Sequence, residues 1–236
     1  MSDNMGVAKV TFNMLTAPSE AFEHLRVKGR AWFPVLVIII FAAAAWIYYY
    51  QVVDFDWAME DLVTSTGGDM SKAQKAEIIK MYQSMGANKM LLMSLGSIVI
   101  MVPIMFAIYG LYFLIASNIR NDNLVYSQCF TLAAWSSIVG SLSWIASMLQ
   151  IAFASSNQIP QSAMKGLNLN DLILNLSNDH AWYTFASNFD LMILWSSALA
   201  AIGYKAWTNC KTTTAYVIGF IPAILIYGIW ALIKVI

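Results

Sequence analysis

Charged residues are scarce in this sequence. They make up 11% of its 236 residues, hydrophobic residues make up 59%, and the mean hydropathy is +0.62. A soluble globular chain is typically about one quarter charged and under half apolar. A soluble core of this length cannot hide such an excess of apolar side chains, whereas a lipid bilayer accepts it. The composition therefore excludes an ordinary soluble domain and predicts an integral membrane protein.

Neither sign of charge dominates, because 13 Lys and Arg residues balance 13 Asp and Glu residues. A nucleic-acid-binding protein needs a basic stripe. The longest basic cluster here is Arg26, Lys28 and Arg30, so we expect no nucleic-acid partner. Cysteine is rare as well. Cys129 and Cys210 lack a zinc-site spacing, and we expect two reduced thiols near the cytoplasmic face.

Long uncharged stretches define the organisation of the chain, because a membrane span needs about 20 apolar residues. They predict an all-α, polytopic membrane protein with a bundle of about five transmembrane helices. The predicted spans are residues 31–53, 90–119, 124–154, 186–207 and 212–233. The fourth is the weakest, since the uncharged segment between Asp190 and Lys205 covers only about 21 Å of a hydrocarbon layer about 30 Å thick.

The flanks of the first span predict its orientation. Arg26, Lys28 and Arg30 precede it, and acidic residues follow it from Asp54 onward. Basic residues are retained in the cytoplasm, so we expect the N-terminus inside and, after five spans, the C-terminus outside. The long apolar run and the roughly thirty residues before it favour an uncleaved span over a signal peptide.

Three further segments read as helices that do not cross the membrane. Residues 18–28 predict an interfacial helix with Phe22 and Leu25 on its apolar face. Residues 72–85 follow a capping-box pattern and end before Gly86, and residues 169–176 have amphipathic spacing. We therefore divide the chain into a cytoplasmic N-terminal segment, residues 1–30, and a transmembrane domain, residues 31–236.

Catalytic residues do not form a constellation. His24 and His180 are the only histidines, and the predicted topology separates them by the membrane. No phosphate-binding loop or nucleophile elbow is present. Glu20, Glu23 and His24 share neighbouring helical faces, for which we favour a solvated surface over a metal site. We expect a protein that is not an enzyme and that binds no cofactor and no metal.

Small polar residues are concentrated in the third span. Ser136 and Gly140, and likewise Ser137 and Ser141, are four residues apart. This spacing is typical of close helix packing in membranes, and a hydrated pathway lined by hydroxyl groups is the functional alternative.

Four other polar residues are candidates for function or for capping the bundle. Asp190 and Asn188 lie at the outer end of the fourth span, and Tyr126 and Gln128 at the cytoplasmic end of the third. A carboxylate inside a membrane is costly and suggests function. The alternative is a first-turn carboxylate that favours the positive end of the helix dipole.

Several short motifs, in order along the chain, resemble the Ypt-interacting-protein (Yip) family, and most closely its bacterial members. The resemblance covers roughly residues 14 to 235 and rests on Leu15-Thr16-Ala17-Pro18 before Phe22, on Trp32 and Pro34, on Tyr126-Ser127-Gln128, and on Phe189-Asp190 with Trp195.

The resemblance implies five spans and a cytoplasmic N-terminus. Eukaryotic members also imply binding of small GTPases and a role in vesicle traffic. They carry Asp-Leu-Tyr-Gly-Pro where this chain reads Arg30-Ala31-Trp32-Phe33-Pro34, and their cytoplasmic head is longer. Both departures count against GTPase binding here.

Taken together, these features predict a non-enzymatic protein of a bacterial inner membrane that organises membrane, lipid or a protein partner. The expected partners are membrane lipids and a membrane protein or a second copy of the chain. The alternative function is permeation or solute transport through the polar third span and Asp190.

Overall fold

The computed structural model describes residues 5–68, 70–178 and 180–235. Among these residues the regular structure is helical, apart from one isolated β-bridge between Asn168 and Asp190. Four helical segments are long and apolar enough to cross a membrane. They are Trp32–Val52, Lys72–Arg120, Tyr126–Ala152 and Thr212–Val235. The predicted all-α, polytopic class is confirmed.

The fourth predicted span corresponds to α9 (Met192–Thr208), which has 17 residues. That length is at the lower limit of the range for transmembrane helices, about 17–25 residues. The count of five spans and the orientation of the chain therefore stay predictions.

The chain forms two compact units. Unit 1 consists of Met1–Ile39, Ile100–Gly140 and Met192–Ile233, and unit 2 consists of Ile40–Val99, Ser141–Leu191 and Lys234–Ile236. Each unit has its own cluster of buried apolar side chains.

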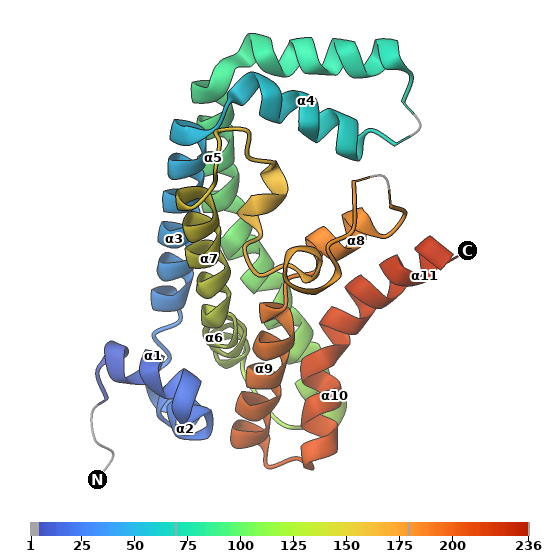
Figure 1. Cartoon of the computed structure of the whole chain (residues 1–236). Helices are drawn as coiled ribbons and strands as arrows, with labels where there is room; N and C mark the ends of the chain where they lie inside the picture. Colours follow the sequence, from blue (N-terminus) through green and yellow to red (C-terminus); the bar gives the residue numbers. More distant parts are fainter. Residues whose placement is uncertain (1–4, 69, 179, 236) are drawn as a thin grey trace. The chain divides into compact units, whose positions relative to one another are not determined.

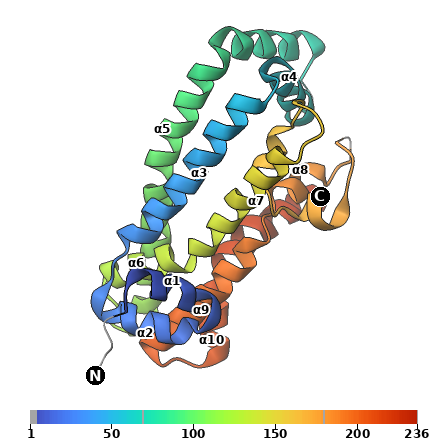
Figure 2. The same cartoon turned by 60° about the vertical axis from the view of Figure 1, so that its left-hand side comes forward.

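Unit 1 is a helical bundle. It contains α1 (Val7–Thr16), α2 (Pro18–Lys28), the start of α3 (Trp32–Val52), the end of α5 (Lys72–Arg120), α6 (Tyr126–Ser136), η1 (Ile138–Gly140), α9, α10 (Thr212–Ala223), η4 (Ile224–Gly228) and most of α11 (Ile229–Val235). Figures 1 and 2 show α9 and α10 side by side, joined by a short connection.

The helix predicted at residues 18–28 is confirmed as α2, but its apolar face packs on protein. Phe22 and Leu25 are buried in the core of unit 1, and α2 contacts α6 and α9. The indole of Trp207 donates a hydrogen bond to the carbonyl oxygen of Phe22. The expectation of a helix resting on lipid through this face is therefore corrected.

Unit 2 contains the rest of α3, α4 (Phe55–Thr66), the start of α5, α7 (Ser141–Ala152), η2 (Gln161–Met164), η3 (Asn170–Leu174) and α8 (Tyr183–Asn188). Its core joins Tyr49 and Tyr50 of α3 to Ile151, Ile159 and Met164. Figures 1 and 2 show α4 alongside the first part of α5.

The capping box at the start of α5 is confirmed. The Ser71 amide donates to Oε1 of Gln74, and the Gln74 amide donates to Oγ of Ser71. Gly86, with φ of 75° and ψ of 159°, interrupts the helical backbone where the first stretch was predicted to end. Only a residue without a side chain adopts this conformation cheaply.

The third predicted span is broken rather than continuous. Its helix ends at Ser136, and the 3₁₀ turn η1 separates it from α7. Ser136 and Ser137 both donate their hydroxyl protons to the carbonyl oxygen of Ala133, at 3.1 and 2.9 Å. Side-chain hydrogen bonds of this kind compete with the helical ladder, which explains the break.

The fourth predicted span begins later than residue 186. The Leu169 amide donates to the Phe189 carbonyl and the Leu191 amide to the Leu167 carbonyl, each at 2.9 Å. These two bonds hold the chain around Asp190 in an extended conformation, so α9 cannot start before Met192.

The helix predicted at residues 169–176 is reduced to a single π-helical turn, η3. Asn175, in a left-handed conformation with φ of 48°, ends it. The Asn170 side chain accepts a hydrogen bond from the amide of Leu176 and closes the turn. Helices α1 and α4 were not predicted.

Candidate functional site

A pocket of about 270 Å³ lies within unit 2. Residues of α3, α4, α7, η2 and α8 line it, so five segments that are distant in sequence meet there. The lining residues are Trp46, Asp61, Leu62, Ser65, Thr66, Trp144, Gln161, Ser162, Met164, Lys165, Tyr183, Thr184, Ser187 and Asn188. The volume is near the lower end, about 300 Å³, of the range for small-molecule sites.

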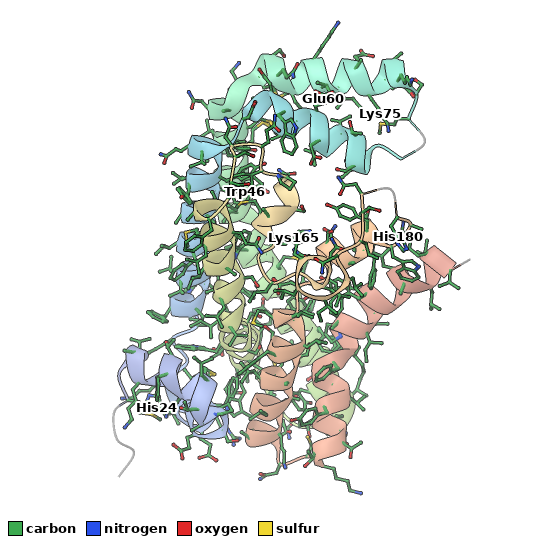
Figure 3. All side chains as sticks on the ribbon, viewed as in Figure 1. His24, Trp46, Glu60, Lys75, Lys165 and His180 are labelled. Atoms are coloured by element: carbon green, nitrogen blue, oxygen red, sulfur yellow. The ribbon has the colours of Figure 1, made fainter. Side chains whose placement is uncertain are left out.

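The loop that carries Lys165 is fixed to α7. The Gly166 amide donates to Oγ of Ser147 at 2.9 Å, and Nε2 of Gln150 donates to the Gly166 carbonyl at 3.0 Å. A Cβ atom at position 166 would lie only 2.3 Å from the backbone nitrogen of Ser147. Glycine is therefore required for this close approach, which places Lys165 at the wall of the pocket (Figure 3).

Lys165 is the basic group of the pocket. Its ammonium donates a hydrogen bond to Oδ1 of Asn188, whose Nδ2 donates to the Thr184 carbonyl at 2.7 Å. Burial lowers the pKa of Lys165, and the negative charge of Asp190 opposes this effect by raising it. The ammonium is thus partly desolvated and held in place by an amide.

Asp61 is the acidic group of the pocket. Burial raises the pKa of its carboxyl group. Among the residues that the structure describes, the Asp61 carboxylate makes no hydrogen bond, and no ion pair within 4.0 Å joins it to Lys165. The pocket therefore has two opposite charges that do not neutralise each other by direct contact.

Ser187 adds an unused hydrogen-bonding group. Its side chain is 3% exposed, and its hydroxyl has no hydrogen-bond partner within the described part of the chain. A buried hydroxyl without a partner costs about 1–3 kcal/mol.

The apolar wall is aromatic. Trp46 stacks on Tyr50 with ring centroids 5.5 Å apart and meets Tyr49 edge to face at 5.8 Å. Tyr49 donates its phenolic proton to the Ile159 carbonyl at 3.0 Å, which ties α3 to the loop before η2. Trp144 and Tyr183 complete this wall.

This arrangement suits binding of a small ligand with both polar and apolar parts. No group of three or more His, Cys, Asp or Glu side chains able to hold a metal ion occurs among the described residues.

Of the residues predicted at the outer end of the fourth span, Asn188 lines the pocket. Asp190 does not line it, but its charge acts on Lys165 and its backbone forms the bridge to Asn168. Asp190 lies before α9 and outside its first turn. Asn188 and Asp190 therefore both act on Lys165, Asn188 through a hydrogen bond and Asp190 through its charge.

Tyr126 and Gln128 belong to unit 1. Tyr126 is exposed, and its hydroxyl donates to the Ala107 carbonyl at 3.3 Å. Oε1 of Gln128 accepts a hydrogen bond from the Val125 amide at 3.1 Å and so caps α6. The structure gives both residues contacts within the bundle.

The four small residues of the third span differ in their surroundings. Ser136 and Ser137 bond to the backbone of their own helix. Ser141 is buried, and its hydroxyl has no hydrogen-bond partner in the described chain. A Cβ atom at Gly140 would meet no described atom within 4 Å, so Gly140 itself makes no close helix contact.

Close helix approach occurs at other glycines of unit 1. A Cβ atom on Gly219 of α10 would lie 2.6 Å from the Ser197 carbonyl oxygen of α9, and one on Gly203 would lie 2.5 Å from Leu132. These positions could not be predicted from the sequence, because isolated glycines in apolar runs have no distinctive spacing.

Lys165, Asp61 and Ser187 were not predicted from the sequence. One signal was available for Lys165, which is the only Lys or Arg between Arg120 and Lys205. Asp61 is one of several acids after the first span, and nothing in the sequence distinguishes it.

Comparison with known proteins gives one result. No curated protein and no solved structure matches the chain. The model of the Yip1 domain family matches residues 12–233, which is nearly the whole length. The match agrees with the resemblance seen in the short motifs, and the chain belongs to the Yip1 domain family.

Proposed function

We propose that this protein is a non-enzymatic membrane protein that binds lipid and thereby organises the membrane around it, with the pocket of unit 2 as the binding site. The observation that carries the proposal is the composition of that pocket. Trp46 and Trp144 come from predicted membrane spans, whereas Asp61 and Lys165 come from the connections between spans. A lipid likewise has apolar acyl chains inside the membrane and a polar headgroup at the membrane surface.

The outer surface of the helices supports the same proposal. Large apolar side chains are exposed along the second half of α5 and along α10, η4 and α11, for example Ile100, Ile108, Leu225 and Leu232. Exposed apolar surface of this extent is stable only in contact with lipid or with another membrane protein.

We place the protein in a bacterial inner membrane with the N-terminus in the cytoplasm. The basic residues Arg26, Lys28 and Arg30 before α3 and the acids after it support this orientation. It puts the pocket of unit 2 at the outer face. A membrane-protein partner or a second copy of the chain would cover part of the exposed apolar surface.

Native mass spectrometry of the protein extracted from its membrane tests the proposal. We expect lipid to remain bound, and Ser65→Trp, which fills the pocket, to reduce the retained fraction. Thr64→Trp is the matched control, because Thr64 is exposed and does not line the pocket. Equal retention by both variants, or no retained lipid at all, would contradict the proposal.

Permeation is the second candidate, and buried hydroxyl groups favour it. Ser141 and Ser143 of α7 are buried, and their hydroxyls have no partner among the described residues. Water in a pathway would satisfy them. Solute or proton flux into liposomes that contain the protein, and its loss in Ser143→Ala, would support this function over lipid binding.

A further inference from the structure

We infer that the pocket of unit 2 binds the headgroup of a zwitterionic phospholipid with a free amino group, an ethanolamine phosphate, with Lys165 on the phosphate and Asp61 on the ammonium. The inference rests on the proposed lipid-binding function and names the class of lipid. It follows from the charges, the unused donor and the aromatic wall of the pocket.

The two charges require a ligand of both signs. Lys165 and Asp61 both line the pocket, and they form no ion pair with each other within 4.0 Å in the described chain. An anionic headgroup would leave the half-buried carboxylate of Asp61 without a partner, and a cationic ligand would leave the half-buried ammonium of Lys165 with only its amide and the charge of Asp190, which does not line the pocket. A zwitterion places an opposite charge beside both groups.

Desolvation of both groups supports this assignment. Burial raises the pKa of Asp61 and lowers the pKa of Lys165, so each group loses hydration in the folded protein. An opposite charge at each position favours the ionised form again. A bound zwitterion therefore reverses both effects at once.

Neighbouring polar groups complete a phosphate site. Ser187 lines the pocket, and its buried hydroxyl lacks a hydrogen-bond partner among the described residues. Ser187 directly precedes Asn188, the last residue of α8, whose Oδ1 accepts a hydrogen bond from the Lys165 ammonium. One ammonium and one hydroxyl donor on the same wall suit phosphate oxygen atoms.

The aromatic wall suits an ammonium group and the start of an acyl chain. Trp46 and Trp144 both line the pocket, and a tryptophan face attracts a cation by its quadrupole. Both residues lie in predicted membrane spans. When the headgroup of a lipid occupies this pocket, its glycerol backbone and acyl chains therefore lie along apolar side chains.

Competition between lipids in native mass spectrometry tests the inference. The purified protein is equilibrated with dioleoyl-phosphatidylethanolamine and dioleoyl-phosphatidylglycerol, and the two bound populations are compared. We expect about tenfold more phosphatidylethanolamine, the factor that follows from one additional charge-assisted hydrogen bond. Equal binding of the two lipids would overturn the inference and leave the proposed function standing.

Two variants separate the roles of the charges. Asp61→Asn should abolish the preference for the amino headgroup while total lipid binding remains, and Lys165→Met should weaken both lipids about tenfold. The matched controls are Glu60→Gln and Lys80→Met, since both residues are exposed and do not line the pocket. Unchanged preference in Asp61→Asn, or unchanged affinity in Lys165→Met, would overturn the inference.

Soluble phosphoethanolamine distinguishes a lipid from a free metabolite. If it displaces bound phosphatidylethanolamine, the headgroup is what the pocket recognises, as we expect. If it binds and no lipid does, the lipid is excluded as the occupant and the proposed function fails as well. The preference of the unmodified protein decides the inference even where a variant does not fold.

Discussion

The indole nitrogen of Trp207 donates a hydrogen bond to the backbone carbonyl oxygen of Phe22 across 2.7 Å. The two rings also meet edge to face, with centroids 6.0 Å apart. Through this pair, α9 holds α2 in the core of unit 1, and a second indole does the same at the end of α2, where Nε1 of Trp135 donates to the Gly29 carbonyl at 3.1 Å.

Trp207→Phe should loosen α2. The substitution removes the indole donor and with it one buried hydrogen bond to the Phe22 carbonyl, a net loss of about 0.5–1.5 kcal/mol. We expect a lower melting temperature in detergent and faster hydrogen exchange of the α2 amides. Trp195→Phe is the control, because Trp195 is 46% exposed. If both variants melt like the unmodified protein, the pair does not stabilise unit 1.

Gly219→Ala and Gly140→Ala should differ although both replace a glycine in a predicted span. At Gly219 the new methyl group would lie 2.6 Å from the Ser197 carbonyl and 2.8 Å from the Ala201 nitrogen. Overpacking of this kind costs about 1–3 kcal/mol. At Gly140 no described atom lies within 4 Å, so the variant should retain or slightly raise its melting temperature. The reverse order would show that α9 and α10 do not pack through Gly219.

Lys165 should make stability depend on pH. Its pKa is lowered in the folded protein from the ordinary 10.5, so the unfolded chain binds the proton more tightly. Stability therefore rises with pH between the lowered pKa and 10.5, and is least below that window. Unfolding by denaturant should show that the free energy of unfolding rises with pH over this range, and Lys165→Met should remove this rise. Lys80→Met should keep the slope; a flattened slope in that control would assign the effect elsewhere.

Asp190→Asn should preserve the fold and enlarge the dependence of stability on pH that Lys165 causes. The bridge to Asn168 is made by the backbone, which asparagine retains, so the fold should persist. Stability at neutral pH should fall, because Lys165 loses a charge that favours its ionised form. Loss of the carboxylate removes the charge that raises the pKa of Lys165. The pH window of Lys165 should therefore begin at a lower pH than in the unmodified protein. An unmoved window would show that Asp190 does not act on Lys165.

The orientation of the chain can be tested by cysteine labelling in intact cells. Met70→Cys, at an exposed position between α4 and α5, should react from outside, and Lys211→Cys, exposed between α9 and α10, only after permeabilisation. Cys210 is a poor reporter because it is 8% exposed. The opposite pattern of labelling would reverse the topology inferred from Arg26, Lys28 and Arg30.

Sequence alone determined the membrane class and most helix positions. Long uncharged runs such as that in α3 need no tertiary information, because backbone groups in lipid must form helical hydrogen bonds within the segment. Local signals were equally sufficient for the capping box of Ser71 and Gln74 and for the turn at Gly86.

Tertiary contacts determine where the long apolar runs break and which residues form the pocket. The helix breaks after Ser136, where the Ser136 hydroxyl donates a hydrogen bond to a backbone carbonyl. Helix α9 starts late because residues 167–169 pair with residues 189–191. Asp61, Lys165 and Ser187 are far apart in sequence and share no spacing. They become a site because Gly166 lets its loop approach α7 closely, a contact between segments that no local pattern encodes.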